Sequence, residues 1–158
     1  MGSAEINPKV PQAFGYTIQN DAELAKVITD PVALASARKE VEATGTYPTI
    51  YVLNHEARRA YAEYLGGRLP TQEEQAAFWD NLPGANVLEK ATAASIPFTG
   101  YFNAEVRKFW CVGEYAYLVS SSPLEGWRKS LNLFRDDREA GEDWFNPEHG
   151  FGFLVVLG

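Results

Sequence analysis

Apolar residues at helical spacing identify a first helix in the middle of the chain. Ala57, Ala60, Tyr61, Tyr64 and Leu65 follow one another at intervals of three and four residues, which places them on one helix face. The Gly66-Gly67 pair directly behind them is typical of a helix C-terminus. The pattern predicts a helix that ends near residue 65.

A second helix follows at once. Thr71-Gln-Glu-Glu74 has the spacing of a capping box, in which the Thr71 hydroxyl and the Glu74 carboxylate each accept a backbone N–H. Phe78, Trp79 and Leu82 then give this helix an apolar side, and Pro83-Gly84 ends it. We expect Arg68, just before the helix, to pair with a carboxylate or with a helix-end carbonyl.

The remaining segments carry strand and turn signals. Asp30-Pro31 begins a further helix that Gly45 ends. Expected strands lie near 14–18 and in 47–53, 109–112, 115–120, 130–134 and 151–157. This order predicts an α+β fold in which two helices, within residues 55–82, pack on a small antiparallel sheet with long loops. Residues 1–46 are expected to form an N-terminal extension packed on a domain of residues 47–158.

Alternation within the expected strands separates core positions from surface positions. In 130–134, period-two geometry turns Leu131 and Leu133 inward and leaves Ser130, Asn132 and Phe134 facing out. We also expect the following residues to face the core: Leu118, Phe151, Phe153 and Val155.

Composition argues against several classes of function. The 158 residues carry a formal net charge of −7, which argues against a nucleic-acid partner. No apolar run is long enough to enter a membrane, and Met1-Gly2-Ser3 resembles a start with a cloning scar, so we expect a soluble chain without a signal peptide. With one cysteine and two histidines, no metal or other cofactor is expected.

The acidic run from Asp136 to Asp143 is the one place where calcium could bind, and a solvated loop explains it better. Cys111 stands beside Trp110 and Val112 in an apolar strand, which predicts a buried and inert thiol.

Several segments resemble the C-type lectin-like fold, in the branch of the formylglycine-generating enzyme and the major paralogous domain. Gly66–Gln75 (GGRLPTQEEQ) is similar to the family segment that leaves the first helix and starts the second. The segments 97–103 (PFTGYFN), 112–122 (VGEYAYLVSSS) and 150–156 (GFGFLVV) resemble later family segments, in the same order.

The resemblance implies a scaffold that displays a loop-dominated C-terminal surface. Within this branch, the chain looks most like a variable protein of a diversity-generating retroelement, from a microbe or its virus. In such systems a reverse transcriptase rewrites codons near the 3′ end of the gene and so changes a ligand-binding face. The resemblance thus implies a non-enzymatic binding protein, with a variable region of about 115–149 and an unknown protein or cell-surface partner. We expect it to act as a monomer.

Aromatic, Arg and amide side chains gather in this region, and such residues supply contact area and directed hydrogen bonds. The candidate ligand-binding residues are Tyr115, Tyr117, Trp127, Arg128, Asn132, Phe134, Arg135, Asp136, Arg138, Trp144, Asn146 and His149. The alternative for Trp127, Trp144 and Phe145 is that they cover the inner face of a small sheet.

Two other functions stay open. One is an enzyme of the sulfatase-modifying, formylglycine-generating type, although its site is built from a cysteine pair and this chain has Cys111 alone. The other is a surface-adhesion module with a fixed partner.

Overall fold

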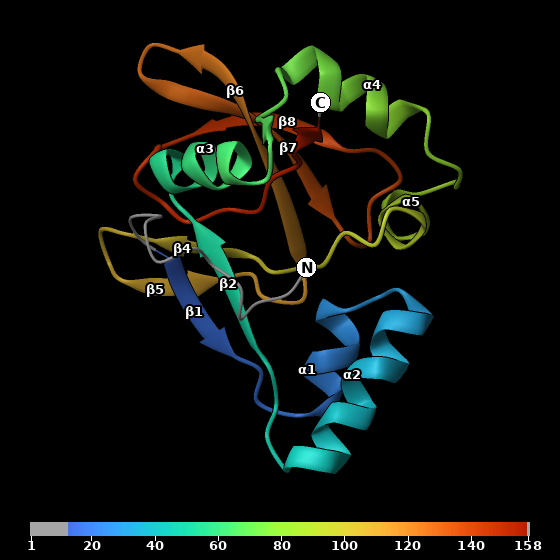
Figure 1. The fold of residues 1–158 in the computed structure, drawn as a ribbon. Coiled ribbons are helices and arrows are strands. Elements are labelled where there is room, and N and C mark those ends of the chain that lie inside the picture. The colour runs from blue at the N-terminus through green and yellow to red at the C-terminus, as the bar shows by residue number, and fades with distance from the viewer. Residues whose placement is uncertain (1–12, 158) are drawn as a thin grey trace.

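The computed structural model describes residues 13–157, which form a mixed α+β fold with small antiparallel sheets (Figure 1). Residues 1–12 of the expected extension, including Met1-Gly2-Ser3, lie outside the described residues. The helices are α1 (Asp21–Val27), α2 (Pro31–Thr44), α3 (His55–Tyr64), α4 (Gln72–Asp80) and α5 (Val87–Ala93). The strands are β1 (Ala13–Thr17), β2 (Thr49–Leu53), β3 (Gly67–Arg68), β4 (Tyr101–Asn103), β5 (Lys108–Trp110), β6 (Tyr115–Leu124), β7 (Trp127–Phe134), β8 (Gly141–Phe145) and β9 (Val156–Leu157).

The N-terminal part combines an antiparallel strand pair with two helices. Strands β1 and β2 pair with Phe14 opposite Val52. Helix α2 begins and ends where the sequence predicts: the Asp30 carboxylate accepts the backbone N–H of Ala33, and Gly45 closes the helix at φ 74°. Helices α1 and α2 lie side by side below the rest of the molecule, around buried apolar side chains of α1 (Figure 1).

Helices α3 and α4 confirm the two predicted central helices. Asn54 caps α3 by accepting the N–H of Ala57, and the capping box of Thr71 and Glu74 is complete at the start of α4. Helix α5 was not predicted. It is a short helix that starts at the cap residue Asn86 and buries Val87 and Ala91 in the main core.

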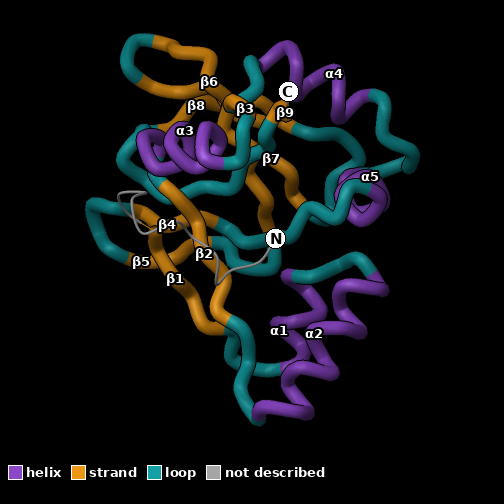
Figure 2. Tube along the Cα trace, in the orientation of Figure 1, coloured by secondary structure: helices purple, strands orange, loops and turns teal. Residues whose placement is uncertain are grey.

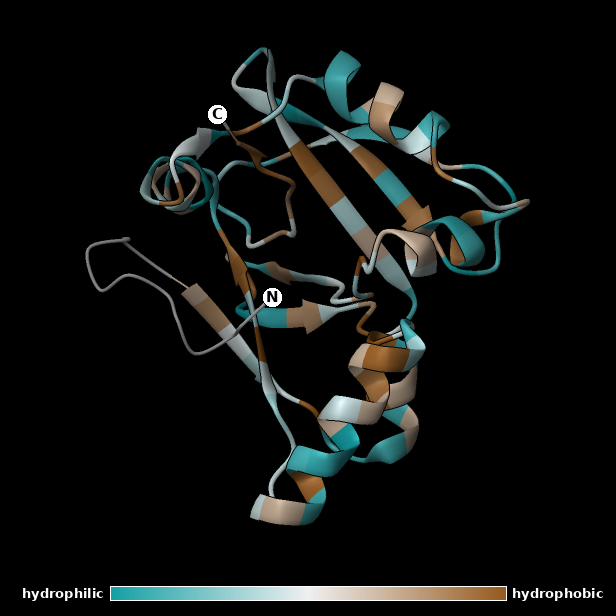
Figure 3. Cartoon of the chain, turned by 45° about the vertical axis from the view of Figure 1, so that its right-hand side comes forward, coloured by the Kyte–Doolittle hydropathy of each residue, from teal (hydrophilic) through white to brown (hydrophobic). Residues whose placement is uncertain are grey.

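The C-terminal part centres on the sheet β6–β7–β8, whose long strands cross the molecule between α3 on one side and α4 and α5 on the other (Figure 1). Hydrophobic segments concentrate inside, in β2 and in these long strands (Figure 3). Strand β8 was not predicted, because its residues Gly-Glu-Asp-Trp-Phe show no apolar alternation. It forms an edge strand on β7, with Asn132 opposite Gly141.

The expected strand at 151–157 is wrong in its extent. Phe151 forms an isolated bridge to Leu53, and Gly152 forms another to Leu118, so this segment divides its backbone between separate partners. Only Val156 and Leu157 form a strand, β9, which pairs with β3 (Figure 2). The pairing is close at Gly67, where an added Cβ would overlap the Val156 carbonyl oxygen.

The expected core positions agree with the structure in part. Leu118, Leu131, Leu133 and Phe151 are buried, whereas Phe153 and Val155 are half-buried. None of the helices within 13–157 has the length and apolar character that crossing a membrane requires.

Candidate functional site

Alternation along the strands gives the β6–β7–β8 sheet two chemically different faces. One of them, here the aliphatic face, consists of Ala116, Leu118, Leu131 and Leu133. It packs against Trp79 of α4 and against the buried side of α5. The predicted inward orientation of Leu131 and Leu133 is therefore confirmed, and helices α4 and α5 pack on their side of the sheet.

The opposite side, here the aromatic face, consists of Tyr115, Tyr117, Phe134 and Phe145. The Tyr115 and Tyr117 rings stack with centroids 5.4 Å apart, and the Tyr115 and Phe134 rings lie 4.8 Å apart. Phe151 packs on the centre of this face, 4.6 Å from Phe145 between ring centroids. A cluster of this kind is held by directed ring contacts as well as by burial.

Tyr117 lies at the buried centre of the aromatic face, with 6% of its surface exposed. Burial, followed by the neighbouring Cys111 thiol and the Tyr101 hydroxyl, raises the pKa of the Tyr117 hydroxyl far above its usual value. The ring is covered by Tyr101, Phe145 and Phe151. The expectation that the Tyr117 side chain contacts a ligand is therefore corrected, because these three rings cover its ring.

His149 needs the same correction. It is buried beside Tyr101 and Phe151, and its Nδ1 accepts the backbone N–H of Ala104 at 3.0 Å. Burial lowers the pKa of this imidazole, so it is neutral at pH 7. His149 holds a loop in place.

The rim of the aromatic face brings together four of the predicted ligand-binding residues. Tyr115, Arg128, Asn132 and Phe134 are all half-buried and lie on this side of β6 and β7. Asn132 Oδ1 accepts a hydrogen bond from the Ser130 hydroxyl at 2.9 Å, and Ser130 itself is buried. Asn132 and Phe134 thus lie on the side that alternation predicts, whereas the expected exposure of Ser130 is wrong.

Two tryptophans of the β7–β8 region are exposed. Trp127 is 45% exposed at the start of β7, and Trp144 is 52% exposed on the edge strand β8. The alternative, in which these two side chains cover the inner face of the sheet, is therefore wrong for both tryptophans. It does describe Phe145, which packs into the aromatic face.

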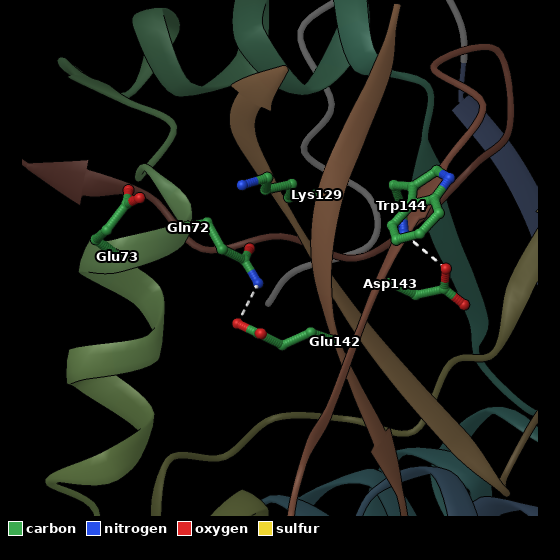
Figure 4. A pocket seen from close by; sticks show the side chains of 6 residues that line it. All are labelled: Gln72, Glu73, Lys129, Glu142, Asp143 and Trp144. Carbon is green, nitrogen blue, oxygen red and sulfur yellow. Dashed lines mark hydrogen bonds between the residues drawn. The ribbon is translucent and has the colours of Figure 1, made fainter. Parts of the chain in front are cut away.

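A pocket of about 410 Å³ lies beside Trp144, between α4 and the β7–β8 strands (Figure 4). Gln72 and Glu142 face each other across it, and Gln72 Nε2 donates to Glu142 Oε1 at 3.2 Å and to the Ser130 carbonyl at 3.0 Å. The lining residues are Gln72, Glu73, Lys129, Glu142, Asp143 and Trp144. The pocket therefore offers an indole, an ammonium group and three carboxylates to a polar ligand.

Arg135 behaves differently from the other predicted residues of the β7–β8 loop. Its guanidinium donates to the backbone carbonyls of Lys26, at 2.8 Å, and of Gly113, and it lies 5.2 Å from the centre of the Phe98 ring. The expectation that Arg135 faces solvent for binding is corrected, because it joins α1 to the loop before β6. Asp136 and Arg138 are exposed, and Asn146 is half-buried.

The prediction for Arg68 is confirmed. Its Nη1 and Nη2 donate to the two oxygens of Glu74, each at 2.7 Å, and Nη1 also donates to the Leu69 carbonyl. This guanidinium, together with the capping bond to Thr71, holds the pKa of the Glu74 carboxyl well below its usual value.

The prediction for Cys111 is wrong, because this residue is exposed. Strand β5 ends at Trp110, and Cys111 turns the chain in the left-handed region at φ 61°. Its carbonyl accepts the N–H groups of Glu114 and Tyr115, so the residue belongs to a turn rather than to an apolar strand.

Sequence reasoning missed two basic side chains, those of Arg58 and His55, that lie with the predicted Arg128 beside the aromatic face. Arg58 of α3 is fully buried, and it donates through Nη1 to the carbonyls of Leu53 and His149. Arg128 Nε donates to His55 Nε2 at 3.2 Å. The signal was present, since Arg58 lies three residues before Tyr61 and four before Ala62, on the inner side of the predicted helix.

Burial, with the positive charges of Arg58 and Arg128, lowers the pKa of His55 to about 4. The imidazole is therefore neutral at pH 7. Burial also lowers the pKa of Arg58, to about 9, so the guanidinium stays charged at that pH.

Within residues 13–157 no three His, Cys, Asp or Glu side chains lie close enough to hold a metal ion. Comparisons of the chain with protein-family models, with curated proteins and with solved structures find no match.

Proposed function

We propose that this chain is a non-enzymatic ligand-binding display protein with a C-type lectin-like fold. The order of β2, α3 and α4, followed by a small antiparallel sheet, supports this fold. The pairing of β3 with β9 also supports it, because it joins the Gly66–Gln75 segment to the closing segment that resembles the same family. These two segments are distant in sequence, and the pairing gives both a structural role.

The observation that carries the proposal is the separation of display positions from core positions. Leu131 and Leu133 are buried, while Trp127 and Trp144, on the same strand and its neighbour, are about half exposed. Exposed tryptophans beside arginine, amide and carboxylate groups are typical of protein contact surfaces. A surface of this kind tolerates substitution because its residues contribute little to the core.

The binding positions of this proposal lie on both sides of the sheet: the half-buried rim belongs to the aromatic face, and the pocket beside Trp144 lies on the side of α4. The partner is a protein or a cell-surface ligand. In the variable protein of a diversity-generating retroelement, substitutions accumulate on such a surface while the scaffold is kept.

Sequencing the locus in a population tests this function. We expect substitutions to concentrate at exposed and rim positions, namely Trp127, Arg128, Asn132 and Trp144, and to spare Leu131 and Leu133. A reverse-transcriptase gene and a near-copy of the 3′ coding end should lie close by. Identical sequences in many independent copies of the locus would contradict the retroelement proposal and favour an adhesion module with a fixed partner.

An oxygen-consumption assay with cysteine-containing peptides separates this function from the enzymatic alternative. We expect no turnover, with the wild type and the Cys111→Ser variant giving the same trace. Turnover that disappears in Cys111→Ser would overturn the non-enzymatic assignment.

A further inference from the structure

Arg58 is a buried cation without a counter-charge among the described residues. It is 0% exposed, and the ion pairs within 13–157 join other residues. The only hydrogen bonds of its side chain there are those of Nη1 to the carbonyls of Leu53 and His149, and the Phe151 ring centre lies 5.9 Å from its guanidinium carbon. Burying an arginine is costly unless a negative group offsets its charge.

One whole edge of this guanidinium is unpaired within residues 13–157. Nε and Nη2 are both buried and have no hydrogen-bond partner there. These two N–H groups lie along the same edge and point in parallel, which matches the two oxygens of a carboxylate. The chain itself shows this geometry on its surface, where Arg38 Nε and Nη2 donate to the two Asp21 oxygens at 2.9 Å and 3.0 Å.

The neighbours of Arg58 add positive charge and another donor. The charge of Arg128 acts on Arg58, and both arginines act on His55. Because His55 Nε2 accepts from Arg128, the proton of the neutral ring is on Nδ1, which is buried and has no partner among the described residues. The cluster therefore holds three buried donor atoms without acceptors in that part of the chain: Nε and Nη2 of Arg58 and Nδ1 of His55.

We propose that Arg58, supported by Arg128 and His55, binds the carboxylate group of a small ligand. The Nε and Nη2 groups of Arg58 donate to its two oxygens, and the nearby Arg128 adds to the positive potential. A monoanion suits this cluster, because Arg58 is the fully buried charge in it and His55 is neutral. The site does not rest on the proposed display function, since the binding donors belong to the buried Arg58, although Arg128 belongs to both surfaces.

Thermal unfolding in different anions tests the site. At pH 7 and constant ionic strength, sodium chloride is replaced stepwise by sodium formate or acetate. We expect the midpoint to rise and then saturate, because a ligand that binds only the folded state stabilises it. Equal midpoints in formate, acetate and chloride at every concentration would overturn the proposal, whatever the variants do.

Two matched variants locate the effect. Arg58→Lys keeps the positive charge but loses the two parallel N–H donors of the guanidinium, and it should weaken carboxylate binding by roughly tenfold or more. Arg59→Lys changes the next residue of the same helix, which is exposed and paired with Glu63, and it should respond like the wild type. An Arg58→Lys variant that keeps the full response would place the carboxylate elsewhere and contradict the assignment.

Nitrogen-15 spectra of the arginine Nε–H groups give a readout that needs no unfolding. The Arg58 signal, identified by its loss in Arg58→Lys, should shift with formate and saturate at the concentrations that saturate the unfolding midpoint. Should Arg58→Lys fail to fold, the response of a buried, exchange-protected Nε–H signal in the wild type decides the question. An unchanged signal, or one that shifts equally with chloride and with formate, would overturn carboxylate binding.

Discussion

The two faces of the β6–β7–β8 sheet are built from neighbouring residues of the same strands, yet they are closed in different ways. Helices α4 and α5 pack on the aliphatic face, and Leu133 there is 0% exposed. The aromatic face is closed only at its centre, by Phe151 and Tyr101, and its rim stays half-open at Tyr115, Asn132 and Phe134. Period-two alternation thus puts the buried leucines on one face and the half-open rim on the other.

Replacing a leucine of the aliphatic face should have the largest effect. Leu133→Ala removes a fully buried side chain and should destabilise the fold by about 2–5 kcal/mol, through lost burial and a residual cavity. Asn132→Ala, at the adjacent position on the other face, is the comparison and should cost less, because it removes the hydrogen bond of the Ser130 hydroxyl and creates no core cavity. Chemical denaturation of both variants tests the contrast, and equal losses would mean that the two faces are equally closed.

Arg135 lies in the β7–β8 loop beside exposed residues, but its guanidinium donates to two backbone carbonyls. We therefore expect it to stabilise the fold. Arg135→Ala should cost about 1.5–3 kcal/mol, the usual range for hydrogen bonds made by a charged group. Arg138→Ala, in the same exposed loop, serves as its control. If both variants unfold at the same denaturant concentration as the wild type, the bonds to Lys26 and Gly113 contribute nothing to stability.

The capping box tests how firmly α4 closes the aliphatic face. Thr71→Ala removes the hydroxyl that accepts the Glu74 N–H and should cost about 1 kcal/mol. Thr92→Ala is a useful comparison, since its hydroxyl bonds to a carbonyl within a helix and caps nothing. An unchanged denaturation midpoint in Thr71→Ala would show that the box does not stabilise the helix.

Exposed residues of the β7–β8 region should contribute least. Alanine at Trp127, Asp136, Arg138 and Trp144 should change stability by no more than about 0.5 kcal/mol per position. The four changes are best combined in one protein and followed by denaturation. A combined variant that fails to fold would show that these side chains belong to the core, and the display proposal would lose its basis.

Metal removal should have no effect at all. EDTA and added calcium are expected to leave the melting temperature unchanged, because the described acidic side chains do not converge on one point. A rise of several degrees with calcium would reveal a site in the 136–143 loop, through preferential binding to the folded state.

Local signals allow much of the fold to be predicted. Helices α2, α3 and α4 have caps and apolar spacing within a few residues of sequence, and the alternation at 130–134 predicts the faces of β7 correctly for both leucines. Strand β8 and the division of 151–157 among separate partners depend on distant residues that leave no local pattern. The exposure of Cys111 likewise depends on a turn, which the sequence does not indicate because the apolar neighbours of Cys111 resemble a strand.

The candidate site is predictable in region but not in detail. Aromatic and arginine content indicates residues 115–149, and four of the predicted residues meet at the rim of the aromatic face. Tyr117 and His149 are buried there because Tyr101 and Phe151, from outside the region, pack on them. Arg58 is missed because helical spacing identifies apolar positions, and a charged residue on the same helix side is normally expected to reach solvent.

The pairing of β3 with β9 can form only at the end of protein synthesis, because the two strands are far apart in the sequence. During synthesis, Gly67 and Arg68 leave the ribosome long before Val156 and Leu157, so the edge of β3 has no partner until β9 has been made. An unpaired strand edge is a site for mispairing with other chains. Because β3 is only two residues long, its unpaired edge offers few backbone groups for mispairing before β9 is synthesised.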